Sequence, residues 1–245
     1  MQRSYYTNSI VLNLKPAGEN NSTVTLLTPD KGIIYATLYG GPKSKLRSLV
    51  ALWHSGKIWL YENPEKKQTK ISDMEVANYH ASFGQNLFKM YAASLAAELA
   101  IKTRCAGSPQ ECLKLISGFF DGMELCDEEG SRLGMLRFLW RYLELMGVRP
   151  ECSDSKAFAR EAISYYNVYE NCFTWERDEQ STHIIPVKNE AVQYLAAISE
   201  LSPSQVRKIP VNKSIYEEIK QFVFFLLERS IETELNTIKT GTGIL

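Results

Sequence analysis

A short basic segment follows two glycines early in the chain, and its residues suit contact with phosphate. The segment Gly40–Arg47 reads GGPKSKLR, so cations stand at every second position, at Lys43, Lys45 and Arg47. Glycine tolerates positive φ angles and lets backbone amides approach an anion closely. Cations at this spacing can neutralise successive phosphates whatever the base sequence. We therefore predict that this segment contacts a nucleic-acid backbone; the alternative is a solvated lysine loop.

Aromatic and basic residues elsewhere extend this predicted site. Bases of a single strand stack on aromatic rings beside a basic groove, and five rings of the N-terminal region are candidates for stacking or, alternatively, for the core: Tyr35, Tyr39, Trp53, Trp59 and Tyr61. Arg137 and Arg141 lie four apart in a helical run and share one face, which suits DNA, an acidic tail or plain solvation. The predicted DNA-binding set is Arg3, Lys31, Tyr39, Lys43, Lys45, Arg47, Arg137 and Arg141.

Patterns typical of enzymes are missing from the sequence. The three histidines, His54, His80 and His183, fall in three different predicted elements without metal-ligand spacing. No GxSxG motif occurs. The stretch that ends in Lys43 and Ser44 is not a GxxxxGK[ST] motif, because its glycines stand at the wrong positions. An enzyme acting through Cys172 or His183 has no set of partner residues. We predict that the protein is not an enzyme.

The composition bounds the class of protein. The chain has 245 residues with 44% hydrophobic and 23% charged residues, which is ordinary for a packed globular protein. No apolar run approaches the roughly 18 residues that a membrane span needs, and no secretory signal is visible. Five irregularly spaced cysteines favour reduced thiols and hence a cytoplasmic protein. Residues 1–74 carry ten Lys or Arg against five Asp or Glu, although the whole chain is neutral.

The elements that must position these residues differ between the two parts of the chain. Residues 1–74 contain five short strand-like runs separated by turn signals, which predicts a small antiparallel β-barrel, either an OB-fold or, as the competitor, an SH3-like barrel. Residues 75–245 carry apolar residues at helical spacing, apart from an irregular excursion at about 151–183. The predicted fold class is therefore α+β, with the barrel followed by a mainly α-helical domain.

Three stretches resemble the RecO family of recombination mediators, and they occur along the chain in the same order as in the family: one in the N-terminal barrel, one at 136–152 and one near the C-terminus. The run LRFLWRYLELMGVRPEC, at 136–152, is similar to the helix end that precedes the family's zinc-binding excursion, and FFLLERSIETELNTIKT resembles its closing helix. The residues that match the pattern of the family's N-terminal barrel are Thr28, Gly32, Ala36, Gly40 or Gly41, Lys43, Ser44 and Leu46.

The resemblance implies a function and a set of partners. It implies a nucleoid-associated protein without catalytic turnover that binds single- and double-stranded DNA, anneals complementary strands and, with RecR, loads RecA onto strands coated by SSB. The alternative is a helical scaffold whose barrel binds protein partners and never touches nucleic acid. The family's four zinc-binding cysteines would fall on Cys152, Ser155, Cys172 and Trp175. Because two thiols are absent and two thiolates hold zinc poorly, we predict no metal and no other cofactor.

Overall fold

The computed structural model describes residues 3–41, 44–152, 162–175 and 183–245. The chain forms two compact units. Unit 1 contains Met1–Arg132 and Leu235–Leu245, and unit 2 contains Leu133–Glu234. Strands and helices occur in both, so the predicted α+β class is confirmed.

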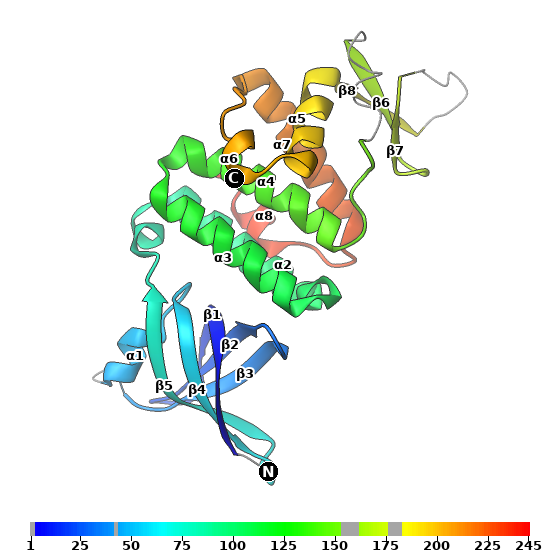
Figure 1. The fold of residues 1–245 in the computed structure, drawn as a ribbon. Helices are drawn as coiled ribbons and strands as arrows, with labels where there is room; N and C mark the ends of the chain where they lie inside the picture. The colour runs from blue at the N-terminus through cyan, green and yellow to red at the C-terminus, as the bar shows by residue number, and fades with distance from the viewer. Residues whose placement is uncertain (1–2, 42–43, 153–161, 176–182) are drawn as a thin grey trace. The chain divides into compact units, whose positions relative to one another are not determined.

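Five strands of unit 1 close into a barrel with the order β1-β2-β3-β5-β4 (Figure 1). They are β1 (Ser4–Pro16), β2 (Ser22–Thr28), β3 (Gly32–Leu38), β4 (Ser55–Asn63) and β5 (Gln68–Asn78). The predicted five strands are thus confirmed. Neighbouring strands pair antiparallel except β3 and β5, which meet in parallel at Thr37 and Lys70 and close the barrel.

The barrel interior is filled by alternate residues of each strand. Val24 and Leu26 on β2 and Ile58 and Leu60 on β4 are at most 1% exposed, as expected when successive side chains point to opposite faces. Burying an aliphatic side chain of this size contributes roughly 1.5–3 kcal/mol. The same alternation places Lys57, Trp59 and Tyr61 of β4 on the outer face of the barrel.

A short helix, α1 (Lys45–Leu49), lies between β3 and β4. Ser48 and Leu49 belong to this helix and not to a strand-like run. Leu46, Leu49 and Val50 have helical spacing and pack against the barrel core, so one turn of helix covers it.

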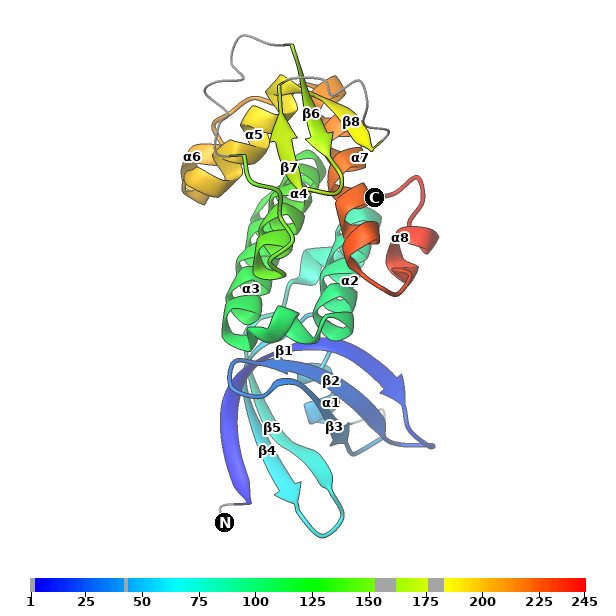
Figure 2. The same ribbon diagram turned by 90° about the vertical axis from the view of Figure 1, so that its right-hand side faces the viewer.

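The other elements of unit 1 are helical. They are η1 (Ala81–Gln85), α2 (Leu87–Lys102), η2 (Arg104–Gly107), α3 (Pro109–Leu125) and α8 (Asn236–Thr240). Of these, α2, η2 and α3 contact the barrel strands, and α8 packs on α2. In both views the N-terminus of β1 and the β4–β5 hairpin lie at the end of the barrel away from α2 and α3 (Figure 2).

The change from strands to helices comes later than predicted. The helical region was expected from residue 75, but β5 continues to Asn78 because Val76 keeps the inward alternation of Met74 and packs on the barrel core. Helix α2 begins only after Asn86, whose side-chain oxygen accepts a hydrogen bond from the Lys89 amide. Whether residues 1–74 fold as a domain of their own stays a prediction.

Unit 2 combines helices with a small sheet. Helix α4 (Glu128–Leu145) starts in unit 1 and ends in unit 2; α5 (Asn189–Glu200), α6 (Pro203–Val206) and α7 (Lys213–Ser230) follow. The sheet has the order β7-β6-β8 and consists of β6 (Ile163–Asn167), β7 (Cys172–Thr174) and β8 (Ile184–Lys188).

Two predictions for this region are wrong. The excursion at 151–183 is not irregular throughout, because 163–167 and 172–174 are strands. The run from Ile185 does not start as a helix: residues 184–188 pair with β6, and α5 starts at Asn189. A tight turn with Asn171 at φ 53° joins β6 to β7. In the part of the chain that the structure describes, no helix is long and apolar enough to span a membrane.

Candidate nucleic-acid interface

The Gly40–Arg47 segment is held in place by one of its own cations. Gly40 has φ +112°, a conformation that side chains rarely adopt, and a Cβ there would lie 3.0 Å from the Ser44 Cβ. Arg47 is half-buried; its guanidinium donates to the Gly40 carbonyl and to the Ser22 hydroxyl, both at 3.3 Å. The arginine therefore fastens the loop back onto the barrel. Its predicted contact with DNA stays a prediction.

Of the two lysines of this segment, the structure describes Lys45. Lys45 is exposed at the start of α1. Lys43 lies outside the described residues. The cation of this segment that the structure places in solvent is therefore Lys45, which can approach a phosphate without breaking an internal bond.

Lys31 is paired with a carboxylate. Its ammonium group contacts Glu62 Oε1 and lies 4.2 Å from the centre of the Tyr5 ring, and the Tyr5 hydroxyl donates to the same carboxylate at 2.8 Å. Hydrogen bonds from Lys31 and Tyr5 hold the pKa of Glu62 below its usual value. Arg3 is exposed, and its carbonyl oxygen accepts from the Glu62 amide at 2.8 Å. Of these two predicted cations, Lys31 is the one whose side chain is paired with Glu62.

Tyr39 is the centre of a polar cluster that the sequence did not reveal. Its ring is 42% exposed, and its hydroxyl accepts from Gln68 Nε2 at 2.9 Å. Gln68 also donates to the Thr37 hydroxyl at 3.3 Å, and the Lys70 ammonium lies 5.0 Å from the centre of the Tyr39 ring. Lys70 joins this cluster because β3 and β5 pair in parallel, which local spacing does not predict.

Arg137 and Arg141 share one face of α4, as predicted, but neither is a freely solvated side chain. Arg137 Nε donates to the Tyr194 hydroxyl at 2.8 Å, and Arg141 Nη2 lies 3.4 Å from the Ile198 carbonyl oxygen. Burial lowers the pKa of Arg141, and the nearby positive charges of Arg137 and Arg207 lower it further. Unit 2 therefore carries a cluster of three arginines, of which Arg207 is exposed.

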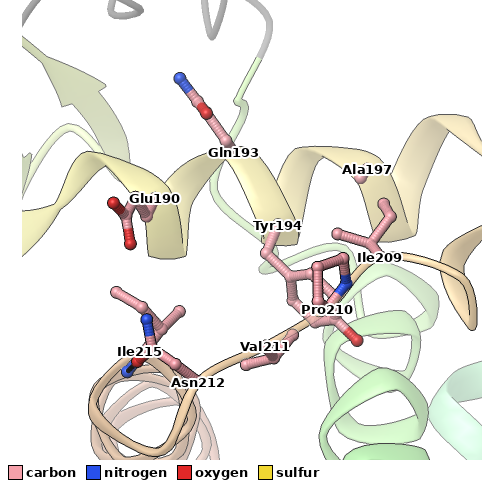
Figure 3. A pocket seen from close by; sticks show the side chains of 9 residues that line it. All are labelled: Glu190, Gln193, Tyr194, Ala197, Ile209, Pro210, Val211, Asn212 and Ile215. Atoms are coloured by element: carbon pink, nitrogen blue, oxygen red, sulfur yellow. Dashed lines mark hydrogen bonds between the residues drawn. The ribbon is translucent and has the colours of Figure 1, made fainter.

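A pocket lies beside this arginine cluster. Its volume is about 360 Å³, and Figure 3 shows the side chains that line it. A second hollow of about 590 Å³ shares four of its residues. The pocket is lined by Glu190, Gln193, Tyr194, Ala197, Ile209, Pro210, Val211, Asn212 and Ile215.

Two of the four positions at which the resemblance places zinc ligands carry thiols with raised pKa values. Burial raises the pKa of Cys152 to about 12, and burial together with Glu170 raises the pKa of Cys172. Zinc binds the thiolate, so raised thiol pKa values oppose its binding. Ser155 lies outside the described residues, and Trp175 offers no ligand atom. Across the described ranges, no group of three or more His, Cys, Asp or Glu side chains could hold a metal ion.

Two family models match consecutive parts of the chain. Recombination protein O N terminal matches residues 1–80, and Recombination protein O C terminal matches residues 84–237. The chain belongs to the RecO family. The barrel and the Gly40–Arg47 segment of this RecO-family chain fall within the first match, and the arginine cluster falls within the second.

Curated relatives carry the same family name. The chain is 23% identical over 269 residues to DNA repair protein RecO of Synechococcus elongatus, covering 100% of this chain and 99% of the relative. Proteins of the same name in Acaryochloris marina and Synechocystis are 31% and 30% identical, over 45% and 46% of this chain and 38% and 42% of theirs. The RecO resemblance drawn from the sequence is thereby confirmed.

Proposed function

We propose that this RecO-family chain is a DNA repair protein that binds single- and double-stranded DNA and anneals complementary strands without catalysing a reaction. The observation that carries the proposal is the match to both RecO family models along almost the whole chain. The strand order β1-β2-β3-β5-β4 supports an OB-type barrel, a fold that binds oligonucleotides on the face of its second and third strands. An SH3-like barrel is the alternative that this order disfavours.

The proposed DNA contacts begin with the exposed cations of the barrel. Lys45 and Arg3 are exposed, and Lys43 stands two residues before Lys45 in the sequence. Lys31 and Arg47 contribute less, because each already has partners within the protein. Tyr39 supplies an exposed ring next to the cation of Lys70.

We propose RecR and SSB as protein partners, with RecA loading on SSB-coated strands as the outcome. The contact surface for RecR stays open. For SSB, the arginines of unit 2 and the pocket beside Tyr194 together suit a peptide that combines carboxylates with an apolar end, such as an acidic tail. Arg137→Ala should then weaken binding of a labelled tail peptide roughly tenfold, and Lys239→Ala, outside unit 2, should leave it unchanged.

Neither a metal nor a cofactor is part of this proposal, and the protein is expected to work in the cytoplasm, at the nucleoid. Cys152 and Cys172, the two thiols at the family's zinc positions, both have a raised pKa and keep their protons at neutral pH. DNA binding and annealing need positioning and charge neutralisation and require no redox group or Lewis acid.

A strand-annealing assay with SSB-coated complementary oligonucleotides tests the proposal. The intact protein should accelerate annealing, and its affinity for DNA should fall about a thousandfold between roughly 50 and 200 mM salt if six or more phosphates are contacted. The double variant Lys43→Glu with Lys45→Glu should weaken binding to all sequences alike. If a labelled oligonucleotide is not bound even at low salt, the barrel is a protein-interaction module and the proposal is wrong.

A further inference from the structure

The pairing of the barrel strands brings outward side chains of four strands into one row. Tyr61 on β4 pairs with Lys70 on β5 and with Ser4 on β1, and Lys70 pairs in parallel with Thr37 on β3. Residues that face each other across a strand pair project on the same side of the sheet. Because Tyr61 lies on the outer face, its partners do too.

The row continues along β1 and β4. Tyr6 pairs directly with Trp59, and their ring centres are 6.2 Å apart at an angle of 45°. The Lys57 ammonium lies 5.1 Å from the centre of the Tyr6 ring and 5.9 Å from that of Trp59. Together with the contact between Tyr39 and Lys70, these residues form an aromatic belt with one cation toward each end. The belt consists of Tyr39, Lys70, Tyr61, Tyr6, Trp59 and Lys57.

Two of the four rings of the belt are exposed to solvent. Tyr6 is 64% exposed and Tyr39 is 42% exposed, while Trp59 and Tyr61 are half-buried. A single exposed ring needs no explanation, but a contiguous set of aromatic side chains on a surface marks a binding site. The belt also reaches the end of the barrel that carries the N-terminus and the β4–β5 hairpin, away from α2 and α3 (Figure 2).

Charge indicates which end of the belt meets phosphate. Asp73 and Glu75 on β5 pair with Trp59 and Lys57, so carboxylates flank that end. Lys70 stands between Tyr39 and Tyr61 without an acidic partner in strand register, since its register partners are Thr37 and Tyr61. Phosphates are therefore favoured at Lys70, and stacking without phosphate contact is favoured at Tyr6 and Trp59.

We propose that a single nucleic-acid strand crosses β3, β5, β4 and β1 on the aromatic belt, with phosphate at Lys70 and bases stacked on Tyr39, Tyr61, Tyr6 and Trp59. This inference rests on the proposed function and adds to it a track separate from the Gly40–Arg47 segment. Unpaired bases are the class of ligand that the belt selects, because a duplex hides the faces of its bases inside the stack. Neighbouring strands are about 4.8 Å apart, so three steps across the sheet span roughly 15 Å, a length that suits a few unstacked nucleotides.

The test compares a thymidine oligonucleotide of about 20 residues with an abasic backbone of the same length, each labelled and titrated with the full-length protein. Tyr6→Ala, Tyr39→Ala and Tyr61→Ala should each weaken binding of the thymidine strand about tenfold and leave abasic binding unchanged. Tyr61→Phe should restore binding, because the ring is kept. Tyr169→Ala, which removes a 71% exposed tyrosine of unit 2, is the matched control and should have no effect.

Tryptophan fluorescence gives an independent readout. Binding of the thymidine strand should quench the emission of the intact protein, and Trp59→Phe should remove most of the quenching. Equal binding of thymidine and abasic strands by the intact protein, or unchanged thymidine binding by all three alanine variants, would overturn the belt while leaving DNA binding intact. Failure of the intact protein to bind either strand at low salt would overturn the proposed function and the belt together.

Discussion

His80 and Asp121 are joined by a hydrogen bond of 3.0 Å between Nε2 and Oδ1, and the other ring nitrogen of His80 lies 2.8 Å from the Trp53 carbonyl oxygen. The ring is 4% exposed and packs against Phe83 and Phe120. His80 therefore connects the loop before β4 to helix α3 within unit 1.

Replacing His80 by alanine should destabilise unit 1 by about 2–4 kcal/mol, because it removes a buried ring and leaves the Trp53 carbonyl without its partner. Urea denaturation followed by tryptophan fluorescence measures the change. His54→Ala is the control: that ring makes one hydrogen bond, to the Leu49 carbonyl, and is less buried, so the loss should be smaller. A loss below about 1 kcal/mol for His80→Ala would show that the connection is dispensable.

Arg47 and Lys45 should respond differently to replacement by alanine. Arg47→Ala removes the bonds to Gly40 and Ser22 and should destabilise the protein by about 1 kcal/mol. Lys45→Ala should leave stability unchanged and should lower the slope of log affinity for DNA against log salt concentration by about one. Thermal unfolding and salt titrations of oligonucleotide binding measure the two effects. A variant Lys45→Ala with an unchanged salt slope would remove Lys45 from the DNA contacts.

Glu98 stabilises the C-terminal helix of unit 1 in a pH-dependent way. Its carboxylate accepts from the Asn236 and Thr237 amides at 2.9 and 2.8 Å and forms an ion pair with Lys102 at 2.9 Å. Burial raises the pKa of Glu98, but these hydrogen bonds outweigh burial and hold the pKa below its usual value. The stabilisation is therefore complete above the unfolded-state pKa and is lost as the pH falls through the lower, folded-state pKa.

Hydrogen exchange of the Asn236 and Thr237 amides checks this prediction. Protection should be high at neutral pH and should fall below about pH 4. Glu98→Gln should reduce it about tenfold at neutral pH, because the charged acceptor is lost. Glu111→Gln is the matched control, since Glu111 forms an exposed ion pair with Lys114 within α3. Full protection in Glu98→Gln would show that helix α8 does not depend on this carboxylate.

Removal of metal should have no effect on this RecO-family chain. Purified protein should contain less than about 0.1 equivalent of zinc by elemental analysis, and a chelator should leave its melting temperature unchanged, because a structural zinc site would contribute folding free energy outright. Cys152→Ser with Cys172→Ser should likewise melt close to the intact protein. A chelator-induced drop in melting temperature would mean that other ligands complete a site.

The sequence predicts the strands of the barrel well, because alternation such as that of Ile58 and Leu60 with Lys57 and Trp59 is a local property. It does not predict the contact between Tyr39 and Lys70, which depends on how β3 and β5 meet when the barrel closes. The sheet of unit 2 was missed for a related reason. Strands of three to five residues, such as β7, are too short to show a period.

The direction of a side chain is likewise not set by spacing. Lys43, Lys45 and Arg47 form a regular pattern in the sequence, yet Arg47 turns inward to the Gly40 carbonyl. Arg137 and Arg141 were correctly placed on one face of a helix. The hydroxyl that accepts the hydrogen bond from Arg137 belongs to Tyr194 on α5, far along the chain. Spacing therefore identified candidate residues and could not identify their partners.

The order of residues in unit 1 bears on how the protein folds during synthesis. Residues 235–245 belong to unit 1 but are synthesised only after the whole of unit 2. The Glu98 carboxylate therefore cannot bind the Asn236 and Thr237 amides until more than half of the chain has been translated after it. A stop codon that removes only these residues should destabilise unit 1, although unit 1 is synthesised first. Helix α2 would then be exposed to chaperones or proteases.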